Sequence, residues 1–416
     1  MLHTSHATRG MVTSPHHLAS QAGLDILKKG GTALEAVVAT AATLSAVYPH
    51  MTGLGGDAFW LIAYPDGRTC VIDACGAAAG QASLALYDKA GHTTIPWRGG
   101  LAANSMAGAV SGWREALRLS ARLQPTLPLQ DLLRDATYYA EQGYAVSDSE
   151  AALLREKQAE LATNPAFMAA YAGADSLVAH GDIRRNPALG RTLRQLAEQG
   201  LDSFYTGPLA QALCADLAES GSPLRLEDFA GHRATLTSPL HTTIRGSTLY
   251  NTPPPTQGVA SLAILKIFDD LPAQDAESFA HIHGLVEATK KAFLFRNAHV
   301  GDPAYMTECA QSFLNDTQQI KQLARASNMH EAMPWPAPSQ QGDTTWMGAI
   351  DASGVAVSMI QSLYFEFGSG VFLPQTGLLW QNRGASFQLG EGAWNAFVPG
   401  RKPFHTLNPA LARFDD

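Results

Sequence analysis

The chain has 416 residues, of which 46% are hydrophobic and 16% charged, a composition typical of a globular protein with a substantial core. The formal net charge is −8, so no basic surface is predicted that would bind nucleic acid or an anionic membrane. There is no run of about twenty apolar residues of the kind that spans a bilayer. The first residues lack the apolar core of a secretory signal, and we expect a cytoplasmic protein.

The N-terminal part predicts two consecutive helices. Apolar residues at helical spacing indicate a helix over 17–29, which Gly30 and Gly31 end. Thr32 is predicted to cap a second helix from Ala33 to about Val47, with Glu35 three residues further as its capping-box partner. Because this second helix is apolar nearly all round, we expect it to be buried on several sides.

The rest of the chain predicts strands at both ends and helices between them. A glycine-rich bend follows the second helix, and 127–236 is predicted to be mostly helical. Further helices are expected from Val259 and over 279–297, whereas the polar, proline-bearing segment 309–341 is predicted to be an exposed loop. Strands are predicted at 58–64, 69–74, 240–250, 345–351, 355–362 and 377–381. This order favours packed sheets with helices outside them.

Several catalytic signatures are missing from the sequence. The motifs GxSxG, HExxH and GxxxxGK[ST] do not occur. The cysteines Cys70, Cys75, Cys214 and Cys309 form no CxxC pair and have no histidine at metal-ligand spacing. We therefore expect neither a metal nor a cofactor.

A candidate nucleophile lies where the polar segment meets a predicted strand, at Gly342-Asp343-Thr344. A threonine hydroxyl needs an adjacent base to act at neutral pH. Cleavage before Thr344 would free an α-amino group with a pKa near roughly 8, which could serve as that base. From spacing alone the indication is weak, because a Thr-Thr pair at the start of a strand is usually a choice of β propensity.

At these residues the sequence resembles the γ-glutamyltranspeptidase family of N-terminal-nucleophile hydrolases. Similar blocks occur in the same order along nearly the whole chain: GLDILKKGGTALEAVVA, PHMTGLGGDAF, FYTGPLA, LRLEDFAGHRA, NTPPPTQGVASL, GDTTW and FGSG. The resemblance implies an α+β fold, the αββα four-layer sandwich, as one catalytic unit over 1–416. It also implies self-cleavage between Asp343 and Thr344 into a large subunit, 1–343, and the start of a small subunit, 344–416.

The resemblance also implies roles for particular residues. Thr344 would be the nucleophile that forms an acyl-enzyme, and Ser362 would hydrogen-bond it, although Ser362 could also be a plain strand hydroxyl. Family members run further than this chain, so we expect a C-terminally truncated small subunit that lacks the glycine pair of the oxyanion hole.

The sequence departs from the family where γ-glutamyl groups are bound. Cys75 stands in place of the arginine that grips the α-carboxylate, and a thiol cannot replace that clamp. Ser386 stands in place of the acid that holds the α-amino group, and Tyr364 in place of an asparagine near the nucleophile. Arg383, beside Asn382 in the same segment, adds a positive charge that could hold a carboxylate close to the scissile amide. Arg383 could alternatively be a surface or ion-pair residue.

These departures favour a small acid amide as the substrate. The segments FGSGVFLP, TGLLWQNRGASFQL and PGRKPFHTLNPAL resemble a branch of the family that acts in purine catabolism, which implies hydrolysis of oxamate to oxalate and ammonia. The predicted substrate-binding residues are Arg383, Tyr364, Asn382 and Ser386. Beyond a small-molecule amide, the expected partners are the two subunits of one precursor, whose heterodimer could pair as a homodimer. The alternatives are a glutathione hydrolase or γ-glutamyltransferase, an acylase of larger amides with a roomy pocket around Tyr364, Phe365 and Trp380, and an uncleaved, non-catalytic relative.

Overall fold

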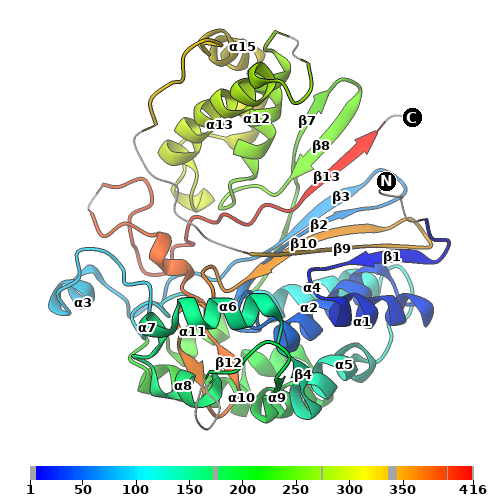
Figure 1. Cartoon of the computed structure of the whole chain (residues 1–416), viewed down its shortest axis with the longest axis vertical. Coiled ribbons are helices and arrows are strands. Elements are labelled where there is room, and N and C mark those ends of the chain that lie inside the picture. Colours follow the sequence, from blue (N-terminus) through cyan, green and yellow to red (C-terminus); the bar gives the residue numbers. More distant parts are fainter. Residues whose placement is uncertain (1–5, 172–176, 273–274, 336–343, 391, 415–416) are drawn as a thin grey trace.

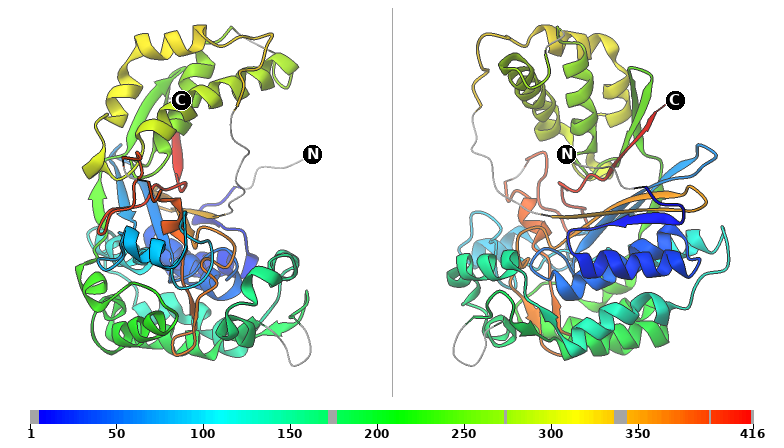
Figure 2. Two further views of the ribbon diagram at one scale, coloured as in Figure 1. Left: turned by 90° about the vertical axis from the view of Figure 1, so that its left-hand side faces the viewer. Right: turned by 45° about the vertical axis from the view of Figure 1, so that its right-hand side comes forward.

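The protein forms four layers, with helices outside two sheets that face each other (Figure 1). The computed structural model describes residues 6–171, 177–272, 275–335, 344–390 and 392–414. The expected αββα sandwich is confirmed, since the lower helices cover a six-stranded sheet and the upper helices cover a three-stranded one (Figure 2).

The six-stranded sheet is antiparallel throughout and combines distant parts of the chain. Its strands, in spatial order, are β1 (Gly10–Thr13), β9 (Thr345–Asp351), β10 (Ala356–Ser362), β2 (Asp57–Ala63), β3 (Thr69–Ala74) and β6 (Thr235–Thr237). Because β9 and β10 lie between β1 and β2, the segments on either side of the predicted cleavage point share one sheet.

The lower layer is centred on one entirely buried helix, α2 (Ala33–Val47), which packs against β9 and β10. Its capping box forms as predicted: Thr32 Oγ1 accepts from the Glu35 N–H, and Glu35 Oε2 accepts from the Thr32 N–H at 2.8 Å. The helices α1 (His17–Lys28), α4 (Ala109–Ser120) and α5 (Leu129–Gln142) pack against it, and α9 (Pro187–Gln199) packs on α5.

The upper layers consist of a second sheet and four helices. The strands are β7 (Leu240–Ile244), β8 (Ser247–Asn251) and β13 (Ala410–Phe414), and the helices are α12 (Gly258–Asp269), α13 (Phe279–His299), α14 (Ala310–Asn315) and α15 (Thr317–Arg325). The single strand predicted over 240–250 is a hairpin. Its turn is made by Arg245 and Gly246, both at positive φ, a geometry typical of two-residue hairpins.

The predicted loop over 309–341 is wrong in its first part, because α14 and α15 lie there. Phe313, Leu314 and Ile320 are buried in the core of the upper lobe, so apolar burial outweighs the polar composition of this segment.

The remaining elements are short or lie at the edge of the lower layer. They are α3 (Leu84–Lys89), α6 (Asp148–Glu156), α7 (Gln158–Leu161), α8 (Pro165–Tyr171), η1 (Leu201–Phe204), α10 (Gly207–Glu219), α11 (Leu226–Gly231), η2 (Pro303–Tyr305), η3 (Arg383–Ser386), β4 (Tyr144–Ala145), β5 (Ile183–Arg184), β11 (Phe372–Leu373) and β12 (Leu378–Leu379). No helix in the described ranges is both long and apolar enough to cross a membrane.

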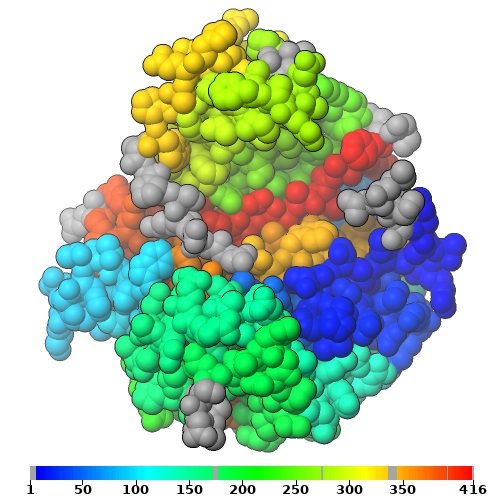
Figure 3. All heavy atoms as spheres, viewed as in Figure 1, coloured from blue at the N-terminus to red at the C-terminus, as the bar shows by residue number. Residues whose placement is uncertain are grey.

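A small buried apolar cluster, made by Phe59, Cys75, Ile360 and Leu407, joins the large sheet to the segment that leads into β13. In the space-filling view, the segment that ends in β13 (red) runs beside the gold of β9 at the surface between the two helical layers (Figure 3). The candidate site lies at the end of the large sheet, near this cluster.

Candidate active site

The candidate nucleophile lies at the end of a row of polar side chains that crosses the large sheet. Ser362 pairs with Asp57, and Gln361 pairs with Thr345. Continuing these registers by one residue brings Thr344 opposite Ser362, and Cys75 opposite Asp57 on the other side. Neighbouring strands are about 4.8 Å apart, so the row Thr344, Ser362, Asp57 and Cys75 forms one edge of a compact site. Asp343 lies outside the described residues.

The glycine-rich bend after α2 packs directly against the end of β10. A Cβ atom on Gly56 would lie 2.2 Å from the Ser362 carbonyl oxygen, so only glycine fits there. The Leu363 N–H donates to the Met51 carbonyl at 3.1 Å. These contacts fix the position at which β10 ends, and with it the position of Ser362.

Ser362 is buried, and its Oγ accepts a hydrogen bond from the Tyr364 N–H at 2.9 Å. A serine hydroxyl that accepts one hydrogen bond can also donate its own hydrogen. Tyr364 has φ 83°, a left-handed conformation that is uncommon for a residue with a side chain. Such backbone strain is often found at functional sites. The contact between Ser362 and the nucleophile stays a prediction.

Arg383 is 1% exposed, so it is not a surface residue. Its guanidinium carbon lies 3.5 Å from the centre of the Tyr364 ring, and its Nη1 donates to Thr406 Oγ1 at 3.1 Å. Within the described ranges, Nε and Nη2 of Arg383 have no hydrogen-bond partner and no carboxylate forms an ion pair with it. Burial lowers the pKa of the guanidinium. A buried cation with unsatisfied donors is a strong candidate for binding an anion.

The neighbours of Arg383 in the sequence support the backbone around it. Asn382 Oδ1 accepts from the Phe365 N–H at 3.2 Å, and Asn382 Nδ2 donates to the Trp97 carbonyl at 3.0 Å. Ser386 Oγ donates to the Phe404 carbonyl at 3.1 Å. These bonds hold the segments that carry Tyr364 and Arg383, and contacts of Asn382 and Ser386 with a substrate stay predictions.

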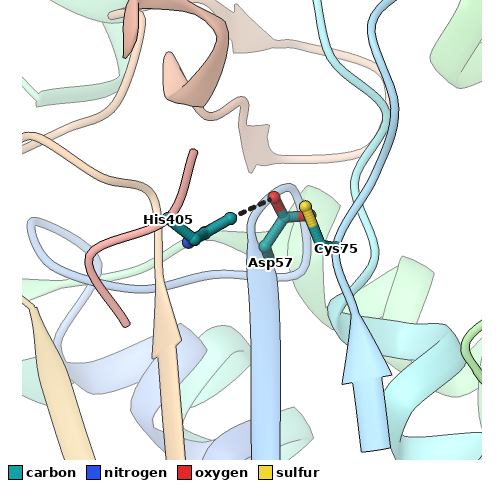
Figure 4. A group of neighbouring side chains, drawn as sticks. All are labelled: Asp57, Cys75 and His405. Atoms are coloured by element: carbon teal, nitrogen blue, oxygen red, sulfur yellow. Dashed lines mark hydrogen bonds and ion pairs between the residues drawn. The ribbon is translucent and has the colours of Figure 1, made fainter. Parts of the chain in front are cut away.

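Sequence reasoning missed a buried group formed by Asp57, Cys75 and His405 (Figure 4). His405 Nε2 lies 2.9 Å from Asp57 Oδ2, and Asp57 Oδ1 accepts the N–H groups of Gly76 and Gly108, each at 3.0 Å. All three side chains are at most 1% exposed. The residues come from β2, the end of β3 and the segment before β13, and no local motif joins them.

Burial sets the charges of this group. It raises the pKa of Asp57 to about 7, against the opposing effect of its hydrogen bonds. It also raises the pKa of the Cys75 thiol well above its usual value, and lowers that of His405 well below its usual value, with the charges of Arg383 and Lys402 adding to the effect on His405. Cys75 and His405 are therefore uncharged at neutral pH, and Asp57 titrates there.

The same three side chains are of the types that bind zinc, and their ligand atoms lie within 4.8 Å of one another. Two features disfavour a cation. Asp57 and His405 are already joined by a direct hydrogen bond. The positive charges of Arg383 and Lys402 act on the same group, although Lys402 is paired with Asp73 at 2.7 Å. The geometry fits a shared proton better than a metal.

Comparison with known proteins assigns this chain to a known family. The sequence model of the family described as gamma-glutamyltranspeptidase matches residues 19–416. The chain is 49% identical to the oxamate amidohydrolase proenzyme of Klebsiella pneumoniae, over 100% of the chain and 78% of that protein. It is 39% identical to a glutathione hydrolase-like proenzyme of Bacillus subtilis, over 97% of the chain and 76% of that protein.

The structure is also similar to solved ones. The crystal structure of cephalosporin acylase from Bacillus halodurans superposes with a TM-score of 0.91 at 30% identity, covering 100% of this chain and 77% of that one. The fold is that of the N-terminal-nucleophile hydrolases, and the chain is a hydrolase of C–N bonds. The chain belongs to the γ-glutamyltranspeptidase family.

Proposed function

We propose that this enzyme hydrolyses a small acid amide, such as oxamate, with Thr344 as its nucleophile after cleavage between Asp343 and Thr344. The observation that carries the proposal is the buried Arg383, whose Nε and Nη2 have no hydrogen-bond partner among the described residues. The 49% identity to an oxamate amidohydrolase proenzyme supports it.

The proposed chemistry needs one residue as nucleophile and base. The free α-amino group of Thr344 accepts the hydroxyl proton while Oγ attacks the amide carbon. The C–N bond then breaks, and the leaving nitrogen takes a proton from the α-ammonium group and departs as ammonia. A water molecule, activated by the same amine, hydrolyses the acyl-threonine ester and releases the acid. For oxamate the products are oxalate and ammonia.

In this scheme Ser362 donates a hydrogen bond to Thr344 Oγ. Its place opposite Thr344 in the extended register, and its burial, support that role. The Tyr364 N–H donates to Ser362 Oγ. The hydroxyl hydrogen of Ser362 therefore points away from that N–H, and in this scheme it is donated to Thr344 Oγ.

Arg383 would hold the carboxylate that lies next to the scissile amide. Hydrogen bonds to a charged partner contribute about 1.5–3 kcal/mol each, and a guanidinium offers two of them in parallel to a carboxylate. Thr406 and Tyr364 orient the guanidinium from two sides. Because Arg383 contacts Tyr364, two residues beyond the end of β10, a substrate with its carboxylate one bond from the amide would bring that amide toward the strand end that carries Ser362.

The alternative substrates receive less support. The Cys75 thiol, at the position expected to carry the carboxylate clamp of γ-glutamyl binding, is buried and uncharged. For an acylase of larger amides, the aromatic residues that would line its pocket have other neighbours. Trp380 is buried and donates to the Ser105 carbonyl, Phe365 packs on Trp97, and Arg383 covers the Tyr364 ring. The non-catalytic alternative is decided by the mass measurement described in the Discussion.

The test is a substrate comparison with purified protein. We expect equal amounts of ammonia and oxalate from oxamate, and little release of p-nitroaniline from γ-glutamyl-p-nitroanilide. Release of p-nitroaniline from γ-glutamyl-p-nitroanilide, with no ammonia formed from oxamate, would overturn the proposal. The cytoplasmic location, the role in purine catabolism and the homodimer stay predictions.

A further inference from the structure

The buried site contains one permanent cation and one group that titrates near neutral pH. Arg383 carries the positive charge, and the Asp57 carboxyl is the acid whose charge acts on it. When Asp57 is ionised, the two charges cancel. His405 is hydrogen-bonded to Asp57. It directly precedes Thr406, the residue that accepts a hydrogen bond from Arg383.

An anionic substrate disturbs this balance. A carboxylate at Arg383 adds a negative charge to a buried region that also contains the ionised Asp57 carboxylate. Like charges in a poorly solvated site repel strongly, because little water screens them. Neutralising Asp57 removes the repulsion and leaves Arg383 paired with the substrate.

We propose that an anionic substrate binds together with one proton from solvent, and that the Asp57–His405 pair holds this proton. The inference rests on the proposed function, because it needs a carboxylate at Arg383. In the bound state, Asp57 Oδ2–H donates to His405 Nε2, and Asp57 Oδ1 still accepts from Gly76 and Gly108. No covalent bond to the substrate forms or breaks. Asp57 and His405 are thus positioning residues that set the charge of the site.

The hydrogen-bond pattern of the pair is suited to this change. With Asp57 ionised, His405 Nε2 carries the hydrogen and Nδ1 is a bare acceptor. With Asp57 protonated, the hydrogen of His405 moves to Nδ1, which becomes a donor. His405 Nδ1 is buried and has no partner among the described residues, so either form costs no existing bond within them.

The groups that face Asp57 are compatible with one titration near neutrality. Besides the backbone N–H groups, they are the charged Arg383, the uncharged Cys75, His405, Gln381 and Tyr205, and the Lys402–Asp73 ion pair beyond Cys75. Because the pKa of Asp57 is about 7 in the free protein, Asp57 is mostly ionised at pH 8 and mostly protonated at pH 6. The number of protons taken up when the anion binds should therefore be close to one at pH 8 and close to zero at pH 6.

The experiment is titration calorimetry of the full-length protein with pyruvate, a monoanion shaped like oxamate that has no amide to cleave. Measurements at pH 8 in two buffers of different ionisation enthalpy give the number of protons taken up. We expect a value near one, and a dissociation constant that rises about tenfold per pH unit above pH 7. Pyruvate binding with no proton uptake at pH 8 would overturn the inference and leave the proposed function standing. No binding at all would contradict the carboxylate site itself, and the linked proton with it.

Variants identify the group that takes the proton. Asparagine at position 57 can still accept from Gly76 and Gly108 and can donate to His405 Nε2, so Asp57→Asn imitates the protonated state. We expect Asp57→Asn to bind pyruvate with no proton uptake and with an affinity independent of pH. The matched control, Asp216→Asn, changes another buried aspartate that accepts a backbone N–H, that of Gln375 at 3.0 Å, and should keep the uptake.

Two results would contradict the assignment to Asp57 and His405. One is proton uptake that persists unchanged in Asp57→Asn. The other is one tightly bound zinc ion per chain in elemental analysis of the wild-type protein, absent from Asp57→Asn, because Asp57 and His405 would then serve a metal. If Asp57→Asn does not fold, the pH dependence and the buffer dependence of wild-type binding still decide whether a proton is taken up.

Discussion

The guanidinium of Arg383 lies over the ring of Tyr364, with its carbon 3.5 Å from the ring centre. Tyr364 follows the end of β10, and Arg383 begins the 3-10 helix η3. Tyr364 keeps a left-handed conformation in this position. A cation held between an aromatic ring and Thr406 is oriented before any ligand arrives. This pre-orientation is the basis of the first two predictions.

Replacing Arg383 by methionine should abolish most of the activity on acid amides. The variant keeps the apolar stem and loses the charge, so we expect kcat/KM for oxamate to fall by about 10²–10⁴, since two charge-assisted hydrogen bonds are lost. Oxamide, which is neutral, serves as the control substrate. An equal loss for oxamide and oxamate would contradict a role in carboxylate recognition.

Tyr364 should act through its ring and not through its hydroxyl. Tyr364→Phe should stay within about twofold of wild type in KM for oxamate. Tyr364→Leu should raise KM by about 3–30-fold, because a cation–π contact contributes about 0.5–2 kcal/mol. Steady-state kinetics of the two variants test this point, and a large defect in Tyr364→Phe would show that the hydroxyl matters instead.

Ser362→Ala should slow both self-cleavage and turnover. Loss of one hydrogen bond to the nucleophile should reduce each rate by about 10-fold or more, and it also leaves the Tyr364 N–H without its acceptor. Ser358→Ala is the matched control, since Ser358 lies on the same strand, is buried and accepts from Trp346 Nε1. Similar rates of self-cleavage in the two variants would show that Ser362 is a plain strand hydroxyl with no role in the reaction.

Acid should destabilise the fold through buried neutral histidines. Burial lowers the pKa of His232 to about 3, below the value of 6.5 for an unfolded chain. The unfolded chain therefore binds a proton at this residue between pH 6.5 and 3 that the folded protein does not. This contribution to stability is present above pH 6.5 and is lost as the pH falls, by up to about 1.4 kcal/mol per pH unit.

The variant His232→Gln tests the acid effect, because glutamine can still donate to Ser111 Oγ and cannot titrate. Chemical unfolding at a series of pH values should show a shallower loss of stability in the variant below pH 6.5. Parallel curves for the variant and the wild type would contradict the assignment.

Local patterns predicted much of the fold, and distant contacts explain what they missed. The Thr32–Glu35 capping box and the strand over 345–351 are set by neighbours in the sequence, and both form as predicted. The hairpin turn at Arg245 and Gly246 was missed because arginine is an unusual residue at positive φ.

The candidate site also combines residues that the sequence identified with residues that only the folded structure brings together. Thr344, Ser362 and Arg383 were identified by comparing the sequence with a known family, whereas His405 was overlooked. Its partner Asp57 is 348 positions away in the sequence, and only the packing of the two sheets brings them together. Burial, which gives Arg383 and Asp57 their unusual properties, is likewise a product of the whole fold.

The most direct test of the account is intact mass spectrometry of the purified protein beside a Thr344→Ala variant. We predict two fragments of the wild type, separated between Asp343 and Thr344, and a single uncut chain for the variant. A single uncut chain of 44.3 kDa for the wild type as well would contradict self-activation and favour a non-catalytic relative.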